Sequence, residues 1–396
     1  MMFKGLAKWF EKHEPKGKWS WLGSTYEAFQ TFAFTPNRVT SKGSHVRDAV
    51  DLKRSMIMVV IALIPAMLFG MWNIGYQHYL ANPSTVNCQL SIINCLWFGF
   101  LRMLPMLAVT YIVGLTIEFT FAQIRHHQVN EGFLVTGFLI PMIVPVTTPL
   151  WQLAIATAFA VIIGKEVFGG TGMNFLNPAL VARAFLFFSY PTRMSGDNVW
   201  IAADLWGTDA IAGATPLAEL AAGMQPSVSA LDMFIGIIPG STCETSVIAI
   251  LLGALLLLFT GIASWRIMLS VVIGGGAMGL LFNLLPTINS QLSTLNYFQL
   301  PFYYHYLMGG FAFGAVFMAT DPVTAAQTNT GKWIYGFLIG AFAVMLRVLN
   351  PAYPEGMMLS ILLMNCFAPL IDHCVIARNI KRRQKRALVK QKATAR

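Results

Sequence analysis

Thr215 is the residue of this sequence whose surroundings best suit covalent chemistry. It lies in the run Ala-Gly-Ala-Thr-Pro-Leu at 212–217, within the longest polar interruption of an otherwise apolar chain, residues 191–242. A hydroxyl held in a small-residue turn outside the lipid is accessible to a modifying enzyme, whereas the same turn inside a helix is not. The sequence therefore predicts a modification site at Thr215.

Asn174 and Asn177 belong to the most unusual internal stretch, a glycine-rich segment at 169–178. Glycine and proline interrupt packed helices, and irregular backbone at membrane depth persists only where protein or a cavity covers it. Two amides three residues apart can project from one side of a helix start and bind a heterocycle that donates and accepts hydrogen bonds. The alternative is a tight re-entrant turn with asparagine caps.

Three acidic residues, Glu118, Asp321 and Asp372, lie at or near the ends of predicted spans, towards one face. Charges at membrane depth are costly and indicate function. Carboxylate oxygens near a cytoplasmic entrance suit a small cation such as Na⁺ or H⁺. The alternative for each acid is a helix cap or an ion pair, for which nearby basic residues are Arg125, Lys332 and Arg378.

Two arginines, Arg183 and Arg347, are also expected at membrane depth. Each needs a partner, because an unpaired buried charge is strongly unfavourable. Glu166 and Glu355 are the candidate partners.

The cysteines and histidines predict no metal centre and no nucleophilic catalyst. The five cysteines, at 88, 95, 243, 366 and 374, form no CxxC pair, and the histidines lack metal-ligand spacing. Cys88 and Cys95 share a predicted external loop and can form a disulfide or be small buried residues. The sequence has no phosphate-binding loop, dinucleotide fingerprint or Ser/His/Asp arrangement, so no catalytic residue is assigned.

Composition predicts a polytopic, all-α membrane protein. The chain is 56% hydrophobic and 11% charged, with a mean hydropathy of +0.61, where soluble domains carry about 25% charged residues. Of the 27 Lys and Arg residues, ten lie in residues 1–54 and nine in 378–396. The net charge of +10 therefore reflects cytoplasmic flanks rather than binding of nucleic acid.

Ten apolar segments of about 20 residues have the length that crosses a bilayer. Five precede the polar interruption and five follow it, which predicts a basic arm at 1–54, membrane halves at 55–190 and 243–376, an external loop at 191–242 and a basic tail at 377–396. The expected spans are 55–75, 97–121, 131–149, 152–170, 175–190, 243–264, 267–287, 301–320, 333–350 and 356–376.

The distribution of charge orients these spans. An even number places both basic termini in the cytoplasm, and the loops on that side carry Arg125, Lys165, Arg266 and Lys332. The 191–242 loop is acidic, which places Thr215 on the external face.

A weak internal duplication accompanies this plan. Matches at 145–147, 158–161 and 177–179 recur at 322–324, 341–344 and 350–352. Five spans per half would invert the second half relative to the first. Short matches of this kind also arise by chance in apolar sequence.

Six stretches together identify a family. They are Val-Asn-Glu-Gly-Phe at 129–133, Lys-Glu-Val-Phe-Gly-Gly-Thr-Gly at 165–172, Asn-Phe-Leu-Asn-Pro-Ala-Leu at 174–180, Gly-Gly-Phe-Ala-Phe-Gly at 309–314, Met-Ala-Thr-Asp-Pro at 318–322 and Asn-Pro-Ala-Tyr-Pro-Glu-Gly-Met-Met at 350–358. With them, over essentially its whole length, the chain resembles the B subunits of the sodium-translocating NADH:quinone reductases of bacterial inner membranes. The resemblance implies a fold similar to urea and ammonium transporters.

The resemblance also implies two flavins. Thr215 matches a threonine that carries covalent FMN through a phosphoester, attached by a flavin transferase. The family usually has Ser or Asp where this chain has Ala212. Asn174 and Asn177 match the site of a noncovalent riboflavin.

The remaining implied sites serve quinone and sodium. Gly114 matches a glycine of the quinone pocket, although Leu115 replaces a second glycine that is frequent in the family. Glu118, Asp321 and Asp372 match acids of the Na⁺ pathway.

The predicted function is that of a membrane component of a redox-driven sodium pump, which carries electrons from FMN through riboflavin to ubiquinone. Its expected partners are the A, C, D, E and F subunits of the same complex, the membrane lipid, quinone and Na⁺; the NADH site belongs to one of those partners. The alternatives are the D subunit of the Rnf complex, which links ferredoxin and NAD, and a solute channel without redox chemistry.

Overall fold

The computed structural model describes residues 26, 40, 42–44, 52–82, 91–125, 132–205, 209–288, 298, 300–350 and 355–394. Nearly all of the basic arm predicted at 1–54, together with Cys88, lies outside these residues. The described chain is mostly helical, as expected. Helix α18 (Met357–Thr394) continues from the last predicted span into the tail predicted at 377–396.

The helices before the polar interruption begin and end as follows: α3 (Leu52–Ala81), α5 (Ile92–Arg125), α6 (Phe133–Met142), α7 (Leu150–Gly164), η2 (Glu166–Phe168) and α8 (Pro178–Ser189). Those after it, besides α18, are α12 (Val247–Phe259), α13 (Trp265–Ile288), α15 (Tyr304–Leu307), α16 (Phe311–Phe313), η4 (Gly314–Met318) and α17 (Asn329–Leu349).

Within the described chain, six helices are long and apolar enough to cross a membrane, while α6, α8 and α12 are shorter apolar helices. Four of the ten predicted spans, 131–149, 175–190, 243–264 and 301–320, are therefore only partly helical. Breaks in the backbone account for two of them. The helix of the first ends at Met142, shortly before Pro145, and the last is divided near Gly309, whose φ of +62° suits glycine.

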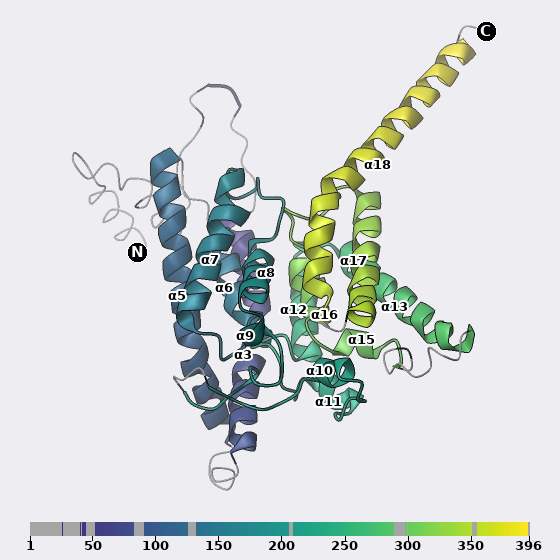
Figure 1. Ribbon diagram of the computed structural model, residues 1–396. Coiled ribbons are helices and arrows are strands. Elements are labelled where there is room, and N and C mark those ends of the chain that lie inside the picture. The colour runs from purple at the N-terminus through teal and green to yellow at the C-terminus, as the bar shows by residue number, and fades with distance from the viewer. Residues whose placement is uncertain are drawn as a thin grey trace, which may run out of the picture.

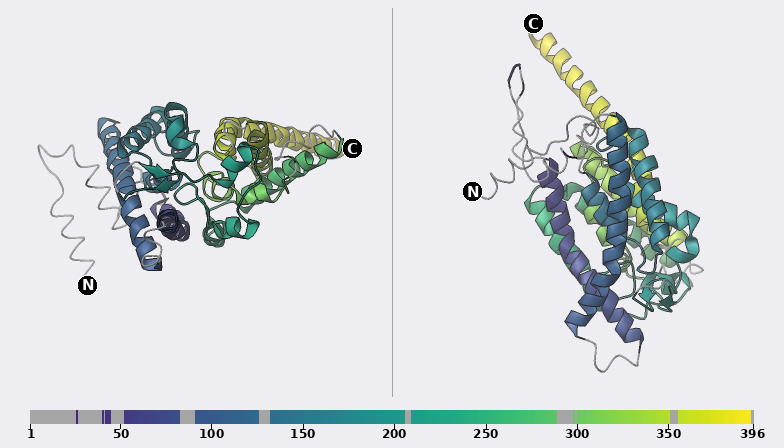
Figure 2. Two further views of the ribbon diagram at one scale, coloured as in Figure 1. Left: turned by 60° about the horizontal axis from the view of Figure 1, so that its bottom comes forward. Right: turned by 90° about the vertical axis from the view of Figure 1, so that its left-hand side faces the viewer.

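The predicted external loop is folded. It contains α9 (Pro191–Met194), α10 (Pro216–Ala221) and α11 (Ala230–Ile235), with a two-stranded antiparallel sheet of β1 (Ile201–Ala202) and β2 (Ala210–Ile211). This small hairpin was not expected from the sequence. In Figures 1 and 2 these elements lie towards the end of the molecule opposite to the start of α3 and the end of α18.

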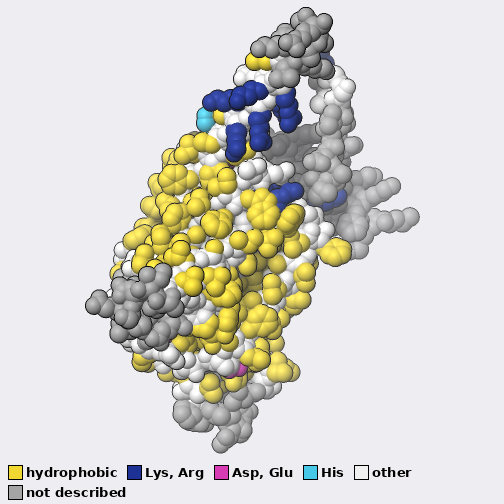
Figure 3. Space-filling model, turned by 90° about the vertical axis from the view of Figure 1, so that its right-hand side faces the viewer, with side chains coloured by type: hydrophobic (Ala, Val, Ile, Leu, Met, Phe, Trp, Pro, Cys, Tyr) yellow, Lys and Arg dark blue, Asp and Glu magenta, His cyan; other side chains and the backbone are white. Residues whose placement is uncertain are grey.

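The outer surface matches a membrane protein. Figure 3 shows hydrophobic side chains covering one face, with Lys and Arg gathered along the projecting part of α18. Large apolar side chains such as Leu255 and Phe259 are exposed. Lipid is the environment in which such a surface is stable, because no polar face is needed there.

Glycines let α13 and α17 approach each other closely. A Cβ on Gly274 would lie 2.0 Å from the carbonyl oxygen of Phe337, and one on Gly340 would lie 2.0 Å from that of Val271. Helices in membranes associate through such small-residue contacts, because lipid gives little hydrophobic drive to helix pairing.

We expect Gly340→Val to destabilise the protein by at least about 1–3 kcal/mol, since the new side chain must push the α13 backbone away. The measurement is thermal unfolding of the purified protein in detergent, followed by tryptophan fluorescence. Leu349→Val on the exposed side of α17 is the control and should melt like the wild type. Equal melting temperatures for Gly340→Val and the control would contradict this packing.

Candidate functional site

Thr215 is the N-cap residue of α10. Its Oγ1 accepts a hydrogen bond of 3.1 Å from the backbone N–H of Ala218, which fixes the hydroxyl oxygen at the helix start. Upstream, Gly213 lies against β1, where an added Cβ would be 2.4 Å from Ile201 Cδ1. The small residues before Thr215 therefore serve close packing as well as access. Thr215 itself is half-buried, and Ala212 is exposed.

A small cavity lies beside Thr215. Its volume is about 90 Å³, and Trp200, Ser195 and Arg183 line it with Thr215. The indole Nε1 of Trp200 is buried and has no hydrogen-bond partner. An unsatisfied buried donor fits a phosphate oxygen on Thr215. The volume lies below the roughly 300–1,000 Å³ of ligand pockets, so a flavin ring attached there would extend outside the cavity.

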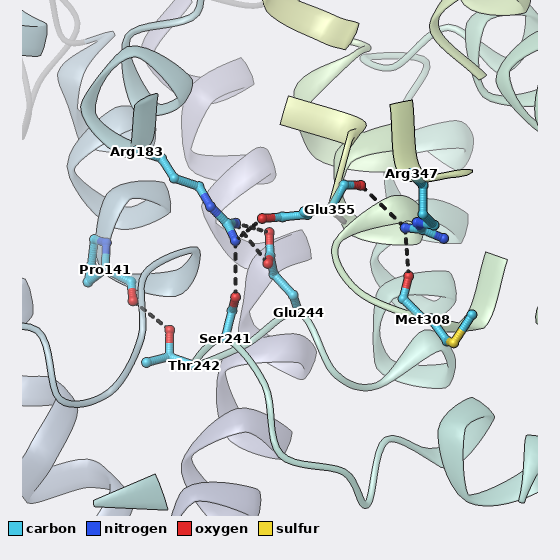
Figure 4. A network of polar contacts seen from close by, with 8 residues as sticks. All are labelled: Pro141, Arg183, Ser241, Thr242, Glu244, Met308, Arg347 and Glu355. Atoms are coloured by element: carbon cyan, nitrogen blue, oxygen red, sulfur yellow. Dashed lines mark hydrogen bonds and ion pairs between the residues drawn. The ribbon is translucent and has the colours of Figure 1, made fainter. Parts of the chain in front are cut away.

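An ion cluster forms one wall of this cavity (Figure 4). Arg183 on α8 donates from Nη1 to both carboxylate oxygens of Glu244, at 3.0 and 2.9 Å, and from Nη2 to Glu355 and to Ser241 Oγ. Of the two candidate partners, Glu355 pairs with Arg183, whereas Glu166 pairs with Arg125. Glu244 was missed because it lies in a sequence predicted to be simply part of a span.

Arg347 on α17 is held by hydrogen bonds to backbone carbonyls. It donates to the backbone carbonyls of His305 at 2.7 Å, Met308 at 3.1 Å and Glu355 at 3.4 Å. Carbonyls at the break between α15 and α16 thus contact a fully buried guanidinium. The segments around the small cavity are thereby tied to α17.

Asn174 and Asn177 line a second, larger cavity of about 420 Å³. Asp321 and Lys165 also line it, so residues from both predicted membrane halves meet here. The volume lies within the range of small-molecule pockets. Thr171 contributes a buried Oγ1 that has no hydrogen-bond partner. A hydroxyl and two amides around a space of this size fit a heterocycle such as riboflavin.

The two asparagines have different roles in the fold. Asn177 caps α8, since its Oδ1 accepts from the N–H of Ala179 at 3.0 Å and of Leu180 at 3.4 Å. Its Nδ2 donates to Asp321 at 3.3 Å. Asn174 makes only a local bond of 3.0 Å to the carbonyl of Leu176. The alternative of an asparagine cap is confirmed for Asn177, and Asn174 remains a candidate ligand.

Asp321 lies in the loop after η4 and is held by hydrogen bonds rather than by Lys332. It accepts from the N–H of Val323 at 3.1 Å, from Thr324 Oγ1 at 3.0 Å and from Asn177. Burial raises the pKa of Asp321, while these three hydrogen bonds oppose that rise.

Glu118 on α5 pairs with Lys165 at the end of α7. Arg125, the partner expected for Glu118, instead contacts Glu166 at 3.2 Å. Lys165 was counted among the basic residues on the cytoplasmic side of the predicted spans, and it is 3% exposed. The high cost of a lysine at membrane depth was the signal that could have identified it.

Asp372 on α18 accepts hydrogen bonds from the residues just before α17. Its carboxylate accepts from the N–H of Gln327 at 2.6 Å, and from the N–H and Oγ1 of Thr328 at 3.0 and 2.6 Å. Arg378, the expected basic neighbour, is not among these partners. No cluster of three His, Cys, Asp or Glu residues suited to a metal occurs in the part of the chain that the structure describes. The three predicted sodium-site acids thus stand apart.

Gly114 lies under an aromatic ring. A Cβ there would be 1.8 Å from Cζ of Phe133, the buried first residue of α6. Gly114 lines neither the small nor the larger cavity. As for the predicted cysteine pair, Cys95 is buried on α5 and Cys88 lies outside the described residues.

Comparison with known proteins gives matches over nearly the whole chain. A sequence model of the NQR2, RnfD, RnfE family matches residues 39–381. The chain is 51% identical over 398 residues to a protein of Ectopseudomonas mendocina (strain ymp), covering 94% of this chain and 96% of that protein. Identity is 47% over 411 residues with a Pseudomonas aeruginosa (strain LESB58) protein and 46% over 417 residues with one from Neisseria meningitidis serogroup A, each covering 97% of this chain and 99% of the relative. All three relatives are named as the B subunit of a Na(+)-translocating NADH-quinone reductase.

We expect Arg183→Met to destabilise the protein by about 3–5 kcal/mol, because Glu244 is left buried without its cation. Thermal unfolding in detergent measures the loss. The control is Arg266→Met, which removes a 3.0 Å hydrogen bond to Asn329 and a contact with the Trp265 ring near the surface. This control should cost about 1 kcal/mol. A smaller loss at position 183 than at 266 would be inconsistent with the ion cluster.

Proposed function

Because the chain belongs to the NQR2, RnfD, RnfE family, we propose that it acts as the B subunit of a Na⁺-translocating NADH:quinone reductase, a redox-driven sodium pump. The observation that carries this proposal is the 46–51% identity over 94–97% of the chain with relatives of that name. The six apolar spanning helices agree with a membrane protein. In this proposal the chain works in the bacterial inner membrane together with the A, C, D, E and F subunits of the complex.

Thr215 is proposed to carry FMN through a phosphodiester made by a flavin transferase. Its place as a half-buried N-cap at the start of α10 supports this, because the cap fixes the oxygen that is modified. The unpartnered Trp200 Nε1 in the same cavity is the donor that would hold a phosphate oxygen. Linkage through the phosphate leaves the flavin ring free to exchange electrons with another protein of the complex.

Riboflavin is proposed to bind in the larger cavity. Its volume, the amide of Asn174 and the unsatisfied hydroxyl of Thr171 support a ligand with both hydrogen-bond donors and acceptors. Asn177 and Asp321, which bond to each other, form a wall of this cavity. The chain's role here is to hold the ring in an enclosed site, where it can receive electrons from the FMN and pass them to ubiquinone.

Quinone is proposed to bind near Gly114, and Na⁺ to pass Glu118, Asp321 and Asp372. The separation of these acids into three hydrogen-bonded sites favours a path over one coordination site. Carboxylate oxygens are hard ligands suited to Na⁺. Phe133, which packs on Gly114, would be the aromatic surface nearest to the quinone ring.

The membrane region is proposed to be two inverted five-helix repeats, similar to urea and ammonium transporters, with both termini cytoplasmic. The order of packing supports the repeat. Helix α5 packs on α6 and α7, and α7 on α8; correspondingly α13 packs on η4 and α17, and α17 on α18. In this arrangement α6 and the α15–η4 segment occupy equivalent positions, and both are broken helices, which often line binding sites.

The D subunit of the Rnf complex is the second candidate, because the matching family model includes RnfD. The discriminating observation is the electron donor of the assembled complex: NADH supports the sodium pump, and reduced ferredoxin supports Rnf. A solute channel without redox chemistry requires no flavin, so a colourless polypeptide would favour it.

We expect Thr215→Asn to abolish covalent flavin while keeping the α10 cap, since Asn caps helices but has no hydroxyl to esterify. In-gel fluorescence of the denatured polypeptide and peptide mass spectrometry measure the attachment. The matched control is Ser229→Ala, which removes the cap of α11 in the same loop and should leave the flavin attached. FMN mass on the Thr215→Asn polypeptide, or none on the wild type, would refute the assignment.

We expect Asn174→Leu to lower noncovalent flavin severalfold without changing covalent flavin, because the side chain lines the cavity but caps no helix. Chromatography of the flavin released on denaturation measures it. Asn283→Leu is the control, since that amide bonds to the carbonyls of Phe298 and Leu300, away from the cavity. An unchanged flavin content in Asn174→Leu would argue against this pocket.

A further inference from the structure

Lys165 connects two parts of the protein that the proposed function treats separately. Its ammonium group pairs with Glu118, a proposed Na⁺ ligand, and the same residue lines the cavity proposed for riboflavin. The side chains of Lys165 and Glu118 are each 4% exposed. A single cation therefore borders both the cation path and the cofactor cavity.

The surroundings make this cation responsive to charge in the cavity. The neighbouring Arg125 and Glu166 pair with each other, and Asp321 is held by Thr324 and Asn177. The Lys165 side chain is a flexible four-carbon stem with three donors, so it can turn from one acceptor to another. Where water is scarce, Coulomb interactions over a few ångströms far exceed thermal energy.

Lys165 lies just beyond the end of α7, in a segment that is not regular α-helix. It follows the last residue of α7, Gly164, and its own backbone has φ −132° and ψ −62°, outside the helical region. The next residues form the short η2 turn and then Gly169, in the left-handed region. A change in the direction of the side chain therefore leaves the α7 hydrogen bonds intact.

We propose that Lys165 is a tethered cation shared between Glu118 and the ligand of the larger cavity, so that negative charge in the cavity frees Glu118 to take Na⁺. The inference rests on the proposed function and extends it to the coupling of electron and ion movement. Each electron passed from FMN to the ligand of this cavity would oxidise FMN by one electron and, before any proton is taken up, would add one negative charge to that ligand. Lys165 turns towards that charge, and a sodium ion replaces it at Glu118.

The test measures the reduction potential of the noncovalent flavin in the assembled complex. Lys165→Gln should lower this potential, because a cation that favours the reduced ligand is removed, and Lys165→Arg should remain close to the wild type. The matched control is Arg102→Gln, which removes a different buried cation, on α5, that bonds to the carbonyls of Val146 and Leu205 and does not line the cavity. It should not shift the potential.

A second measurement is the Na⁺ concentration that gives half-maximal quinone reduction. Lys165→Gln should lower this concentration severalfold, since the competing cation at Glu118 is gone, whereas Glu118→Gln should raise it. In Lys165→Gln, Glu118 is left unpaired, and this can prevent assembly of the complex. The double variant Lys165→Gln with Glu118→Gln removes both charges of this pair, and its noncovalent flavin should still have a lowered reduction potential.

The outcomes separate this inference from the proposed function. A wild-type complex that releases no noncovalent flavin overturns the proposed function. Normal flavin content with an unchanged potential and Na⁺ dependence in Lys165→Gln overturns the inference alone. Equal shifts in Lys165→Gln and Arg102→Gln overturn it as well, because a general loss of positive charge would then explain the result.

Discussion

A guanidinium buried in an apolar environment needs hydrogen-bond or ionic partners, and the partners of Arg183 bring together the segments around Thr215. One carboxylate comes from the loop before α12 and the other from the residues before α18, so three segments far apart in sequence converge on one cation. A second buried arginine, Arg347, bonds to carbonyls at the break between α15 and α16. The helix breaks and the charges thus depend on each other, since the breaks provide the unpaired carbonyls that a buried cation needs.

The two cavities differ in size and surroundings, and each suits a different one of the two proposed flavins. The smaller one, of about 90 Å³, has room for the phosphate proposed at Thr215 but not for a flavin ring, whereas the larger one, of about 420 Å³, is lined by residues of both predicted membrane halves and has room for the proposed riboflavin. The small cavity borders the Arg183 cluster, and the larger one borders the Lys165 pair. Each cavity therefore lies next to a buried cation that is already paired with a carboxylate of the same chain.

The sequence predicted which buried charged residues need a partner better than it predicted which residue each of them contacts. The cost of buried charge was sufficient to predict that Arg183 needs a partner, with Glu355 as one of two candidates. Glu244 was placed within a span, and Lys165 was counted among the basic residues of the cytoplasmic side. Proximity in the chain suggested Arg125 for Glu118, whereas α7 brings Lys165 there from 47 residues away. Hydropathy found the apolar segments but not their helix lengths, because proline and glycine end α6 and divide the 301–320 segment without lowering the hydrophobicity.

The contact between Gly114 and Phe133 has a genetic consequence. Even the methyl group of alanine would overlap the aromatic ring, so a viable replacement at this position requires α5 and α6 to separate or the ring to rotate. A variant with a larger residue at position 114 would therefore carry an altered spacing of α5 and α6. Compensating second-site changes would be found on α6, in residues that restore the spacing.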